Sequence, residues 1–446
     1  MSRELAVFLY GHLIGYVAQS PAGAHSFRYD DAYLATSAPT PLSLSMPLAR
    51  STYTRKNIEP WLSGLLPDSG EVRERWGARF GVSGENPFAL LEQVGLDCAG
   101  AVQFIRVDEA KDNEVTLPRA GRLVEVSEAE IGDRLMRLGS DPAAWAVSGE
   151  RWSLAGAQAK FALARGRDGR WYEPSGSAAS THILKPGLQH YRDQALNEHV
   201  CLQSARALGL NAVRTDYLEF DGQRALVVTR YDRRRRRGSD AVIRVHQEDM
   251  CQALSVYPRR KYESSKGPTS AQIARLLRSR SSRGQDDVEA FVRAVAFNYL
   301  IGAPDAHAKN YSVRLAGSDV ELAPLYDVAS AFPYEPTRTD HELDEAAMSI
   351  GGQRRFGSVS GRHWDRWASA CGVDAEAVRS MVGQLCAELP DAVASAFGSH
   401  AASHAELRSR LVDAVASHTH RTATGLRRSL TKSWSAPAHR RSRLTR

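Results

Sequence analysis

Three polar residues in the second half of the chain have the types and spacing that phosphoryl transfer requires. Asp305 is followed five positions later by Asn310, and Asp327 comes seventeen positions after that. In a loop that leaves a helix, such an aspartate can accept the proton of an attacking hydroxyl, while the asparagine and a second aspartate bind Mg²⁺. Because Mg²⁺ prefers oxygen ligands and usually takes only one or two carboxylates from a protein, this small set is sufficient.

The hydrophobic spacing predicts the elements that would position these residues. An amphipathic helix over 288–301 precedes Asp305, and a strand-like segment over 311–315 follows Asn310. The Asp-x4-Asn spacing alone is also common in ordinary surface loops. The prediction of a phosphoryl-transfer site therefore depends on further residues elsewhere in the chain.

An upstream lysine and glutamate add to it. Lys185 ends a short strand, and Glu198 lies in the helix predicted over 193–208. A strand lysine held by a helix carboxylate and reaching nucleotide phosphates recurs in phosphoryl-transfer enzymes. Before them, the small-residue segment from Ser153 to Lys160 could cradle phosphates with its backbone amides, although it matches neither GxGxxG nor GxxxxGK[ST].

The whole chain reads as two lobes. Strand patterns joined by turns at Gly11-His12 and Asp221-Gly222 dominate the first part, and Ser127-x-x-Glu130 predicts the capped start of a helix. After about residue 245 the apolar spacing becomes helical. We predict an α+β, bilobal, protein-kinase-like fold with a β-rich N-terminal lobe and an all-helical C-terminal lobe.

Within this fold we expect four segments. They are a β-rich subdomain over 1–110, an ATP-binding part over 124–231, a helical lobe over 232–418 and a basic, disordered tail over 419–446, with a polar linker over 107–123 between the first two.

Composition fits a globular protein and shows where its basic charge lies. The 446 residues carry a net charge of +7, with 43% hydrophobic and 24% charged residues. The last 26 residues hold eight basic residues and no acid, which leaves 50 basic against 51 acidic residues upstream. We expect no membrane span and a cytoplasmic location, and five scattered cysteines predict reduced thiols rather than a disulfide framework.

Taken together, these segments resemble the HipA-type serine/threonine kinases, the toxins of bacterial type II toxin–antitoxin modules. The resemblance extends to about residue 400 and rests on LSLSMPL, WLSGLLPDSGEVRER, NPFALLEQVGLDCAGAVQF, SLAGAQAKFAL, THILKP, NEHVCLQSARALGL, VVTRYDR, HQEDMCQAL with RKYE, DAHAKNYSV and LAPLYDVAS.

The resemblance implies roles for individual residues. Asp305 would be the catalytic base, Asn310 and Asp327 the Mg²⁺ ligands, and Lys185 a contact to the ATP phosphates. Ser153 would be the serine that such kinases autophosphorylate to silence themselves. The remaining nucleotide-binding positions would be Gly156, Ala157, Gln158 and Lys160 in the phosphate loop, the backbone of Thr229, Arg230 and Tyr231 at the hinge, and His307 and Lys309 in the catalytic loop, with His307 ordering that loop rather than binding metal.

The sequence departs from the family pattern at two places. Gly302-Ala303-Pro304-Asp305 stands where the family has Gly-Asn-x-Asp, and Pro304 removes an amide, which could reduce activity without abolishing it. At the hinge, Thr229 replaces a glutamate, which matters little if backbone groups recognise the nucleotide.

The resemblance also implies partners: a helix-turn-helix antitoxin, operator DNA bound through the antitoxin complex, and a translation component as substrate, for which glutamyl-tRNA synthetase is the precedent. Two alternatives stay open, a small-molecule phosphotransferase and a catalytically weak, DNA-tethered corepressor. The arginine run 233–237 is either a solvated hairpin tip or a contact to phosphate backbones, and we expect Lys261-Tyr262-Glu263 to brace the lobes.

Overall fold

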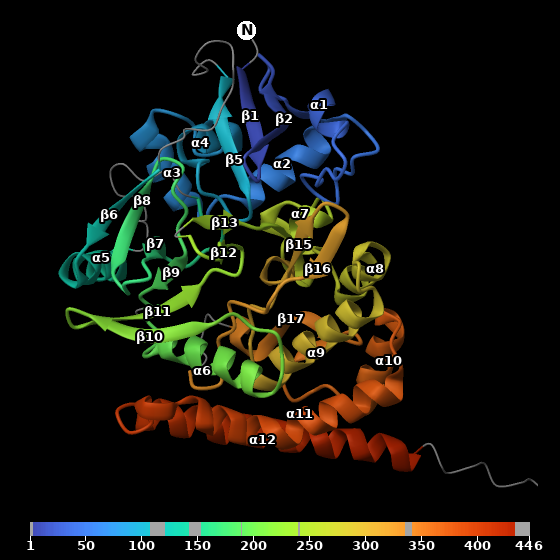
Figure 1. Cartoon of the computed structure of the whole chain (residues 1–446). Coiled ribbons are helices and arrows are strands. Elements are labelled where there is room, and N and C mark those ends of the chain that lie inside the picture. The colour runs from blue at the N-terminus through green and yellow to red at the C-terminus, as the bar shows by residue number, and fades with distance from the viewer. Residues whose placement is uncertain are drawn as a thin grey trace, which may run out of the picture.

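The computed structural model describes residues 3–107, 121–141, 153–188, 190–239, 241–334 and 341–432, without the side chains of 341–342 and 427–432. Figure 1 shows a β-rich upper half and a mainly helical lower half, with the last helix lying along the base. No helix in this described part is long and apolar enough to cross a membrane.

The N-terminal domain is an antiparallel sheet of order β4-β3-β2-β1-β5, covered by short helices. Its first hairpin turns at Tyr10 and Gly11, both with positive φ, as a type I′ turn requires. Its elements are β1 (Arg3–Leu9), β2 (His12–Gln19), β3 (His25–Tyr29), α1 (Asp31–Leu34), β4 (Thr52–Thr54), α2 (Arg55–Gly64), α3 (Gly70–Phe80), α4 (Pro87–Val94) and β5 (Val102–Arg106).

A second antiparallel sheet of six strands, in the order β10-β11-β9-β7-β8-β6, follows. The capping box at Ser127 and Glu130 and the turn at Asp221-Gly222 are both confirmed. The elements of this part are β6 (Arg122–Val126), α5 (Glu128–Ser140), β7 (Phe161–Arg165), β8 (Trp171–Ser175), β9 (His182–Lys185), α6 (Gln194–Ala207), β10 (Thr215–Phe220), β11 (Gln223–Thr229), β12 (Arg233–Arg235) and β13 (Val242–Arg244). Most of the predicted linker, residues 108–120, lies outside the described residues, and its last residues begin β6.

The C-terminal lobe is built around α9, and α12 packs along α11. Its elements are β14 (His246–Asp249), α7 (Met250–Ala253), α8 (Ser270–Arg280), α9 (Gln285–Ile301), β15 (Ser312–Ala316), β16 (Asp319–Leu322), β17 (Glu345–Ile350), β18 (Gln353–Arg355), α10 (Gly361–Cys371), α11 (Ala375–Ala396) and α12 (Ala405–Lys432).

The prediction of an all-helical C-terminal lobe is wrong. The lobe contains a three-stranded sheet, β14-β15-β16, and a hairpin, β17-β18. Strand β14 is wholly buried and pairs with β15 through His246 opposite Leu315, a partner far along the chain that local spacing does not reveal.

The prediction of a disordered tail from residue 419 is also wrong for its first part, because α12 runs to Lys432. Its inner face continues with Leu411, Val415 and Leu426, and the buried Thr419 and Thr422 donate their hydroxyls to carbonyls one turn earlier at 2.9 and 3.0 Å. Threonine on such a face is satisfied within the helix and need not reach water. Residues 433–446 lie outside the described part.

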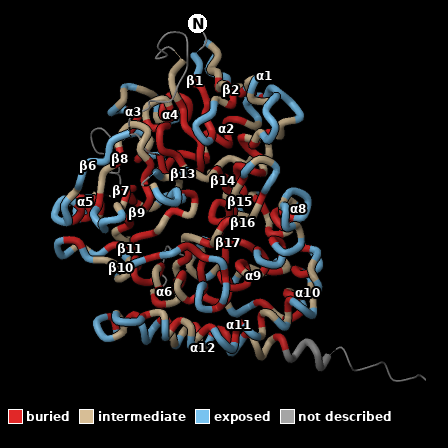
Figure 2. Tube along the Cα trace, viewed as in Figure 1, coloured by how far each residue is buried: buried red, intermediate tan, exposed pale blue. Residues whose placement is uncertain are grey.

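Two hydrophobic cores organise the molecule, and Figure 2 shows these buried stretches inside both halves. The upper core joins the N-terminal domain to the six-stranded sheet, for example through Trp61, Phe104, Phe161 and Val227. The lower core joins α6 to the C-terminal lobe. The first hundred residues therefore share their core with the following sheet. All five cysteines are buried as free thiols.

Candidate active site

A cavity of about 440 Å³ opens where the N-terminal domain, the six-stranded sheet and the C-terminal lobe meet. It is lined by every residue that the sequence singled out for chemistry except Ser153. Its walls also include Asp68, from the connection between α2 and α3, which sequence reasoning did not identify.

The loop that carries Asp305 begins where α9 ends. Gly302 closes the helix at φ +74°, and a Cβ there would lie 2.5 Å from the Phe332 ring, so only glycine fits. The Ala303 amide donates to the Asn298 carbonyl at 2.9 Å, which ties the loop to α9 just before Pro304. Asp305 lies on the cavity wall with a 60% exposed side chain, and the Tyr262 hydroxyl donates to its Oδ1.

Asn310 and Asp327 are adjacent, as the spacing predicted. The Asn310 amide donates to the carbonyl of Asp305 at 2.7 Å and to that of Asp327 at 3.5 Å. Asp327 has a positive φ of 60°, which is uncommon for a residue with a side chain and typical of functional sites. One amide and one carboxylate on a cavity wall fit Mg²⁺ that phosphates and water also coordinate, and no cluster of three or more His, Cys, Asp or Glu residues in the described part offers an all-protein metal cage.

Lys185 is held by two carboxylates. Its Nζ donates to Glu198 Oε1 at 2.7 Å and to Asp327 Oδ1, and it is almost completely buried. Burial lowers the pKa of a lysine, but the charges of Asp327 and Glu198 outweigh it and raise the pKa of Lys185 above its ordinary value. This lysine is therefore a fixed positive charge in the cavity.

The segment 153–160 is bound to the N-terminal domain. The hydroxyl of Ser153, which is fully buried, donates to the Leu65 carbonyl at 2.7 Å, and the Gly156 carbonyl accepts the Asp68 amide at 2.9 Å. Gly156 has a φ of +110°, a backbone conformation that residues with a side chain rarely adopt and that glycine allows. In the same segment, the Gln158 amide donates to Gln194 at 3.2 Å.

Lys160 is buried beside Lys185 and donates to the Ala155 carbonyl at 2.8 Å. Burial, together with repulsion from Lys185, lowers the pKa of Lys160 to about 8. Lys160 therefore loses its charge as the pH rises through about 8, well below the range in which an ordinary lysine does so.

At the predicted hinge, two of the three backbone amides are already used within the protein. The Thr229 amide donates to Arg214 and the Arg230 amide to Thr181, at 2.9 and 3.0 Å. The Tyr231 ring stacks on the Tyr326 ring with 5.8 Å between their centres.

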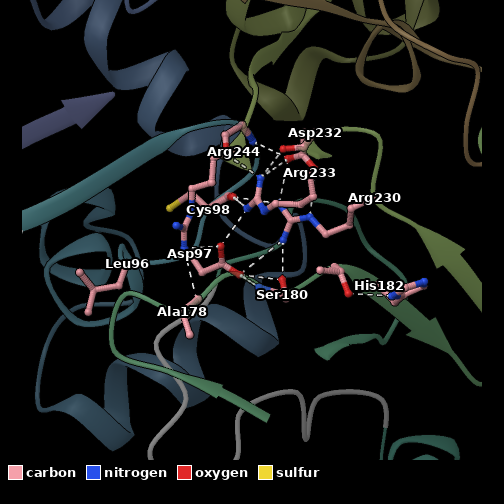
Figure 3. Close-up of polar contacts among 12 residues, drawn as sticks. Leu96, Asp97, Cys98, Ala178, Ser180, His182, Arg230, Asp232, Arg233 and Arg244 are labelled. Atoms are coloured by element: carbon pink, nitrogen blue, oxygen red, sulfur yellow. Dashed lines mark hydrogen bonds and ion pairs between the residues drawn. The ribbon is translucent and has the colours of Figure 1, made fainter. Parts of the chain in front are cut away.

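The Arg230 side chain belongs to a buried ionic cluster beneath the hinge (Figure 3). Arg230 and Arg233 pair with Asp232 and Asp97, and Asp97 also accepts Ser180 Oγ at 2.6 Å. The first arginine of the 233–237 run is thus structural, while Arg234 and Arg235 are exposed on β12. Asp97, which follows α4, links the N-terminal domain to the hinge.

His307 and Lys309, between Asp305 and Asn310, both line the cavity and also have contacts within the protein. The His307 ring packs edge to face against the Tyr262 ring at 4.9 Å, and burial lowers its pKa to about 3, so it is neutral. The His307 amide also donates to the Asp305 carbonyl at 2.8 Å, and its ring Nε2 lies 3.7 Å from Asp305 Oδ1. Lys309 is bound by Asp68 at 2.5 Å.

Lys261-Tyr262-Glu263 was expected to brace the lobes, and Lys261 does bond across them, whereas Glu263 bonds within the C-terminal lobe. Lys261 donates to Asp68 in the N-terminal domain at 2.8 Å, and Glu263 accepts the amide and hydroxyl of Ser349 at 2.7 Å each. Tyr262, between them, contacts Asp305 directly. The motif was visible in the sequence, but its partners were not.

Comparison with known proteins agrees with this geometry. The family model of the HipA N-terminal domain matches residues 5–105 of this chain. The family model of the HipA-like C-terminal domain matches residues 152–393. The serine/threonine-protein kinase toxin HipA of Shewanella oneidensis is 30% identical over 370 residues, covering 79% of this chain and 80% of that protein. The protein Y4mE of Sinorhizobium fredii is 35% identical over 393 residues, covering 88% of this chain and 91% of that protein.

Among solved structures, the Shewanella oneidensis toxin–antitoxin complex of HipA, HipB and operator DNA contains a chain that superimposes with a TM-score of 0.80. The identity is 25%, and the match covers 95% of this chain and 98% of that chain. With both family domains present in order and the fold shared over nearly its whole length, the chain belongs to the HipA family of serine/threonine kinase toxins.

Proposed function

We propose that this protein is an ATP- and Mg²⁺-dependent serine/threonine protein kinase that arrests growth as the toxin of a type II toxin–antitoxin module. The observation that carries the proposal is the meeting of Lys185, Asp305, Asn310 and Asp327 on one cavity. They come from β9, the loop after α9 and the segment after β16, so their convergence depends on the fold.

Each residue has a defined part in this proposal. Asn310 and Asp327 would hold Mg²⁺, which when bound neutralises charge on the phosphates. Lys185, kept charged by its carboxylate partners, would bind phosphate oxygens. Asp305, exposed to the cavity and oriented by Tyr262, would position the acceptor hydroxyl and take its proton.

We further propose that phosphorylation of Ser153 inactivates the enzyme. The buried hydroxyl already bonds to Leu65, so a phosphate there would place nearly two negative charges in a site with no room for their solvation. Its modification therefore requires the segment to leave the N-terminal domain, and it would prevent the segment's return to the phosphate-binding position.

The partners follow from the relatives. We propose a helix-turn-helix antitoxin and operator DNA bound together with it, and the presence of the similar solved chain in a toxin–antitoxin complex with HipB and operator DNA supports this. We also propose a translation component such as glutamyl-tRNA synthetase as the protein substrate, as the resemblance of the sequence to HipA-type kinases implies.

Growth and turnover measurements distinguish this function from its alternatives. Expression of the wild type should arrest growth, and Asp305→Ala or Asp327→Ala should relieve the arrest while leaving the protein folded. Growth arrest that persists in both variants would contradict the kinase proposal. Transfer to a small molecule instead of a protein would favour a small-molecule phosphotransferase, and DNA-dependent repression without ATP turnover would favour the corepressor.

A further inference from the structure

Asp68 is an N-terminal-domain residue that reaches the catalytic loop. It lies between α2 and α3 and lines the cavity together with Asp305 and Asn310. Its backbone amide donates to the Gly156 carbonyl at 2.9 Å, so the same residue also touches the phosphate-binding segment.

The Asp68 carboxylate pairs with two lysines of the C-terminal lobe, one on each oxygen. Oδ1 accepts Lys309 at 2.5 Å and Oδ2 accepts Lys261 at 2.8 Å. The side chains of Asp68, Lys261 and Lys309 are only 11%, 13% and 4% exposed. Burial opposes ionisation of Asp68, but Lys309 and Lys261 outweigh it and hold its pKa well below the usual range.

Both lysines are connected to the loop that carries Asp305, the proposed catalytic base. Lys309 lies in the 3-10 turn 308–310, one residue before Asn310. The Lys261 carbonyl accepts the Ala308 amide at 3.3 Å, and the next residue, Tyr262, donates to Asp305. Asp68 is therefore connected to the loop by two routes, through Lys309 inside it and through Lys261 beside it.

The geometry differs from an ordinary surface ion pair. Exposed pairs contribute little because water and salt screen them, whereas a buried charge that loses its partner is strongly disfavoured. Removing the Asp68 charge would leave the buried ammonium groups of Lys309 and Lys261 without the carboxylate that now pairs with both of them. The loop can then relax only by moving, and small displacements of catalytic groups are costly to the reaction rate.

We propose that Asp68 is a positioning residue of the kinase site, which makes the N-terminal domain part of the catalytic apparatus. This inference rests on the proposed phosphoryl transfer for its effect on rate. Its structural content, that Asp68 orders the catalytic loop, stands separately. Asp68 acts through Lys309 and Lys261 and takes no part in the proton transfer itself.

The test uses Asp68→Asn, which keeps the size of the side chain, and Glu71→Gln as a matched control, since Glu71 is a nearby exposed acid paired only with Arg75 in the described structure. In Asp68→Asn we expect kcat to fall on the order of 10- to 100-fold, with the Kd for Mg·ATP unchanged or tighter because two positive charges are released. Glu71→Gln should keep both values.

A double-mutant cycle isolates the contact. Lys309→Met, which breaks one of the two ion pairs of Asp68, should reproduce part of the loss of kcat, and Asp68→Asn/Lys309→Met should fall no further than Asp68→Asn, because Asp68→Asn already breaks the pair with Lys309. Additive losses would contradict the proposal. So would wild-type kcat in a folded Asp68→Asn, or a parallel loss of kcat and ATP affinity.

Hydrogen exchange separates this inference from the proposed function. Residues 303–311 should exchange faster in Asp68→Asn than in the wild type and should be unchanged in Glu71→Gln. If the wild type transfers no phosphate, the proposed function fails, and exchange still decides whether Asp68 orders the loop. Identical exchange in all three proteins overturns the inference whatever the activity.

Discussion

Two buried lysines in the same cavity behave in opposite ways, and their partners explain the difference. Lys185 faces Glu198 and Asp327, and its pKa is raised. Lys160 donates to a carbonyl and is repelled by Lys185, and its pKa is lowered to about 8. Lys185 is thus a permanent charge, whereas the charge of Lys160 depends on pH.

This difference predicts a pH dependence of nucleotide binding. The Kd for Mg·ATP should rise as pH increases through about 8, because Lys160 loses the charge that attracts phosphate. Titration of binding from pH 6.5 to 9.5 measures it, and Lys160→Met should bind more weakly without that inflection. An identical inflection in Lys160→Met would assign it to another group.

The lowered pKa of Lys160 also determines how its contribution to protein stability changes with pH. The folded pKa of Lys160, about 8, lies below its ordinary value of 10.5, so the folded state binds fewer protons than the unfolded state between these values. The contribution of Lys160 to stability should therefore increase as pH rises over this window. Urea unfolding of the wild type and of Lys160→Met at pH 8 and 10 measures this contribution as the difference in unfolding free energy between the two proteins at each pH.

We expect substitutions of Glu198 to lower the reaction rate and the stability of the fold. Glu198→Gln leaves Lys185 paired with Asp327 alone, and this pairing competes with the metal binding that we propose for Asp327. We expect kcat/KM to fall about tenfold or more, equivalent to roughly 1.4 kcal/mol. Glu198→Ala, which breaks a buried pair, should also cost about 3 kcal/mol of unfolding free energy. Steady-state kinetics and denaturant unfolding test the two parts, and an unchanged kcat/KM in Glu198→Gln would contradict the role.

At the scale of elements, the end of α9 sets the position of the loop that carries Asp305, the proposed catalytic base. Gly302→Ala must adopt a left-handed conformation and strike the Phe332 ring, so we expect a loss of about 2–4 kcal/mol in unfolding free energy. Gly209→Ala, at the end of α6 with a similar φ of +78° and open space around it, should lose only about 1 kcal/mol. Equal losses would show that the ring contact is unimportant.

Helix α12 predicts where the chain can be shortened. Truncation after residue 432 should leave the melting temperature nearly unchanged, whereas truncation after residue 418 removes the buried Thr419, Thr422 and Leu426 and should lower it clearly. Calorimetry of both truncated chains tests the prediction. A large loss from the shorter deletion would contradict it.

The sequence predicted the elements that local patterns specify. The turn at Asp221-Gly222, the capping box and the helices over 193–208 and 288–301 are confirmed, with small shifts at the helix ends, whereas the first turn lies one residue earlier than predicted, at Tyr10-Gly11. The predicted pairing of Lys185 with Glu198 is also confirmed. Asp68 and Asp97 were missed because their partners are 241 and 136 residues away, and no local spacing encodes such contacts.

At the scale of the whole molecule, the excess basic charge lies in a different part of the chain from the residues that form the cavity. The cavity is formed by the neutral body of the chain, while basic residues are concentrated in the final segment and in the exposed part of the arginine run. Deletion of residues 433–446 should reduce the salt dependence of DNA binding and leave kinase activity intact. Binding isotherms at several salt concentrations measure this, and an unchanged slope would exclude the segment from DNA contact.

The shared upper core gives the N-terminal domain a second role besides completing the site. It holds Ser153 through Leu65 and the hinge through Asp97, so release of the phosphate-binding segment must break contacts to this domain. The proposed inactivation is therefore a change between domains as well as a local modification.

Phosphopeptide mass spectrometry of Ser153 tests the central claim most directly. Wild-type protein incubated with Mg·ATP should carry phosphate at Ser153, and Asp305→Ala, produced in the same way in cells lacking other protein kinases, should carry none. Phosphate on Ser153 of Asp305→Ala, or its absence from a wild type that binds ATP, would contradict phosphoryl transfer by this site.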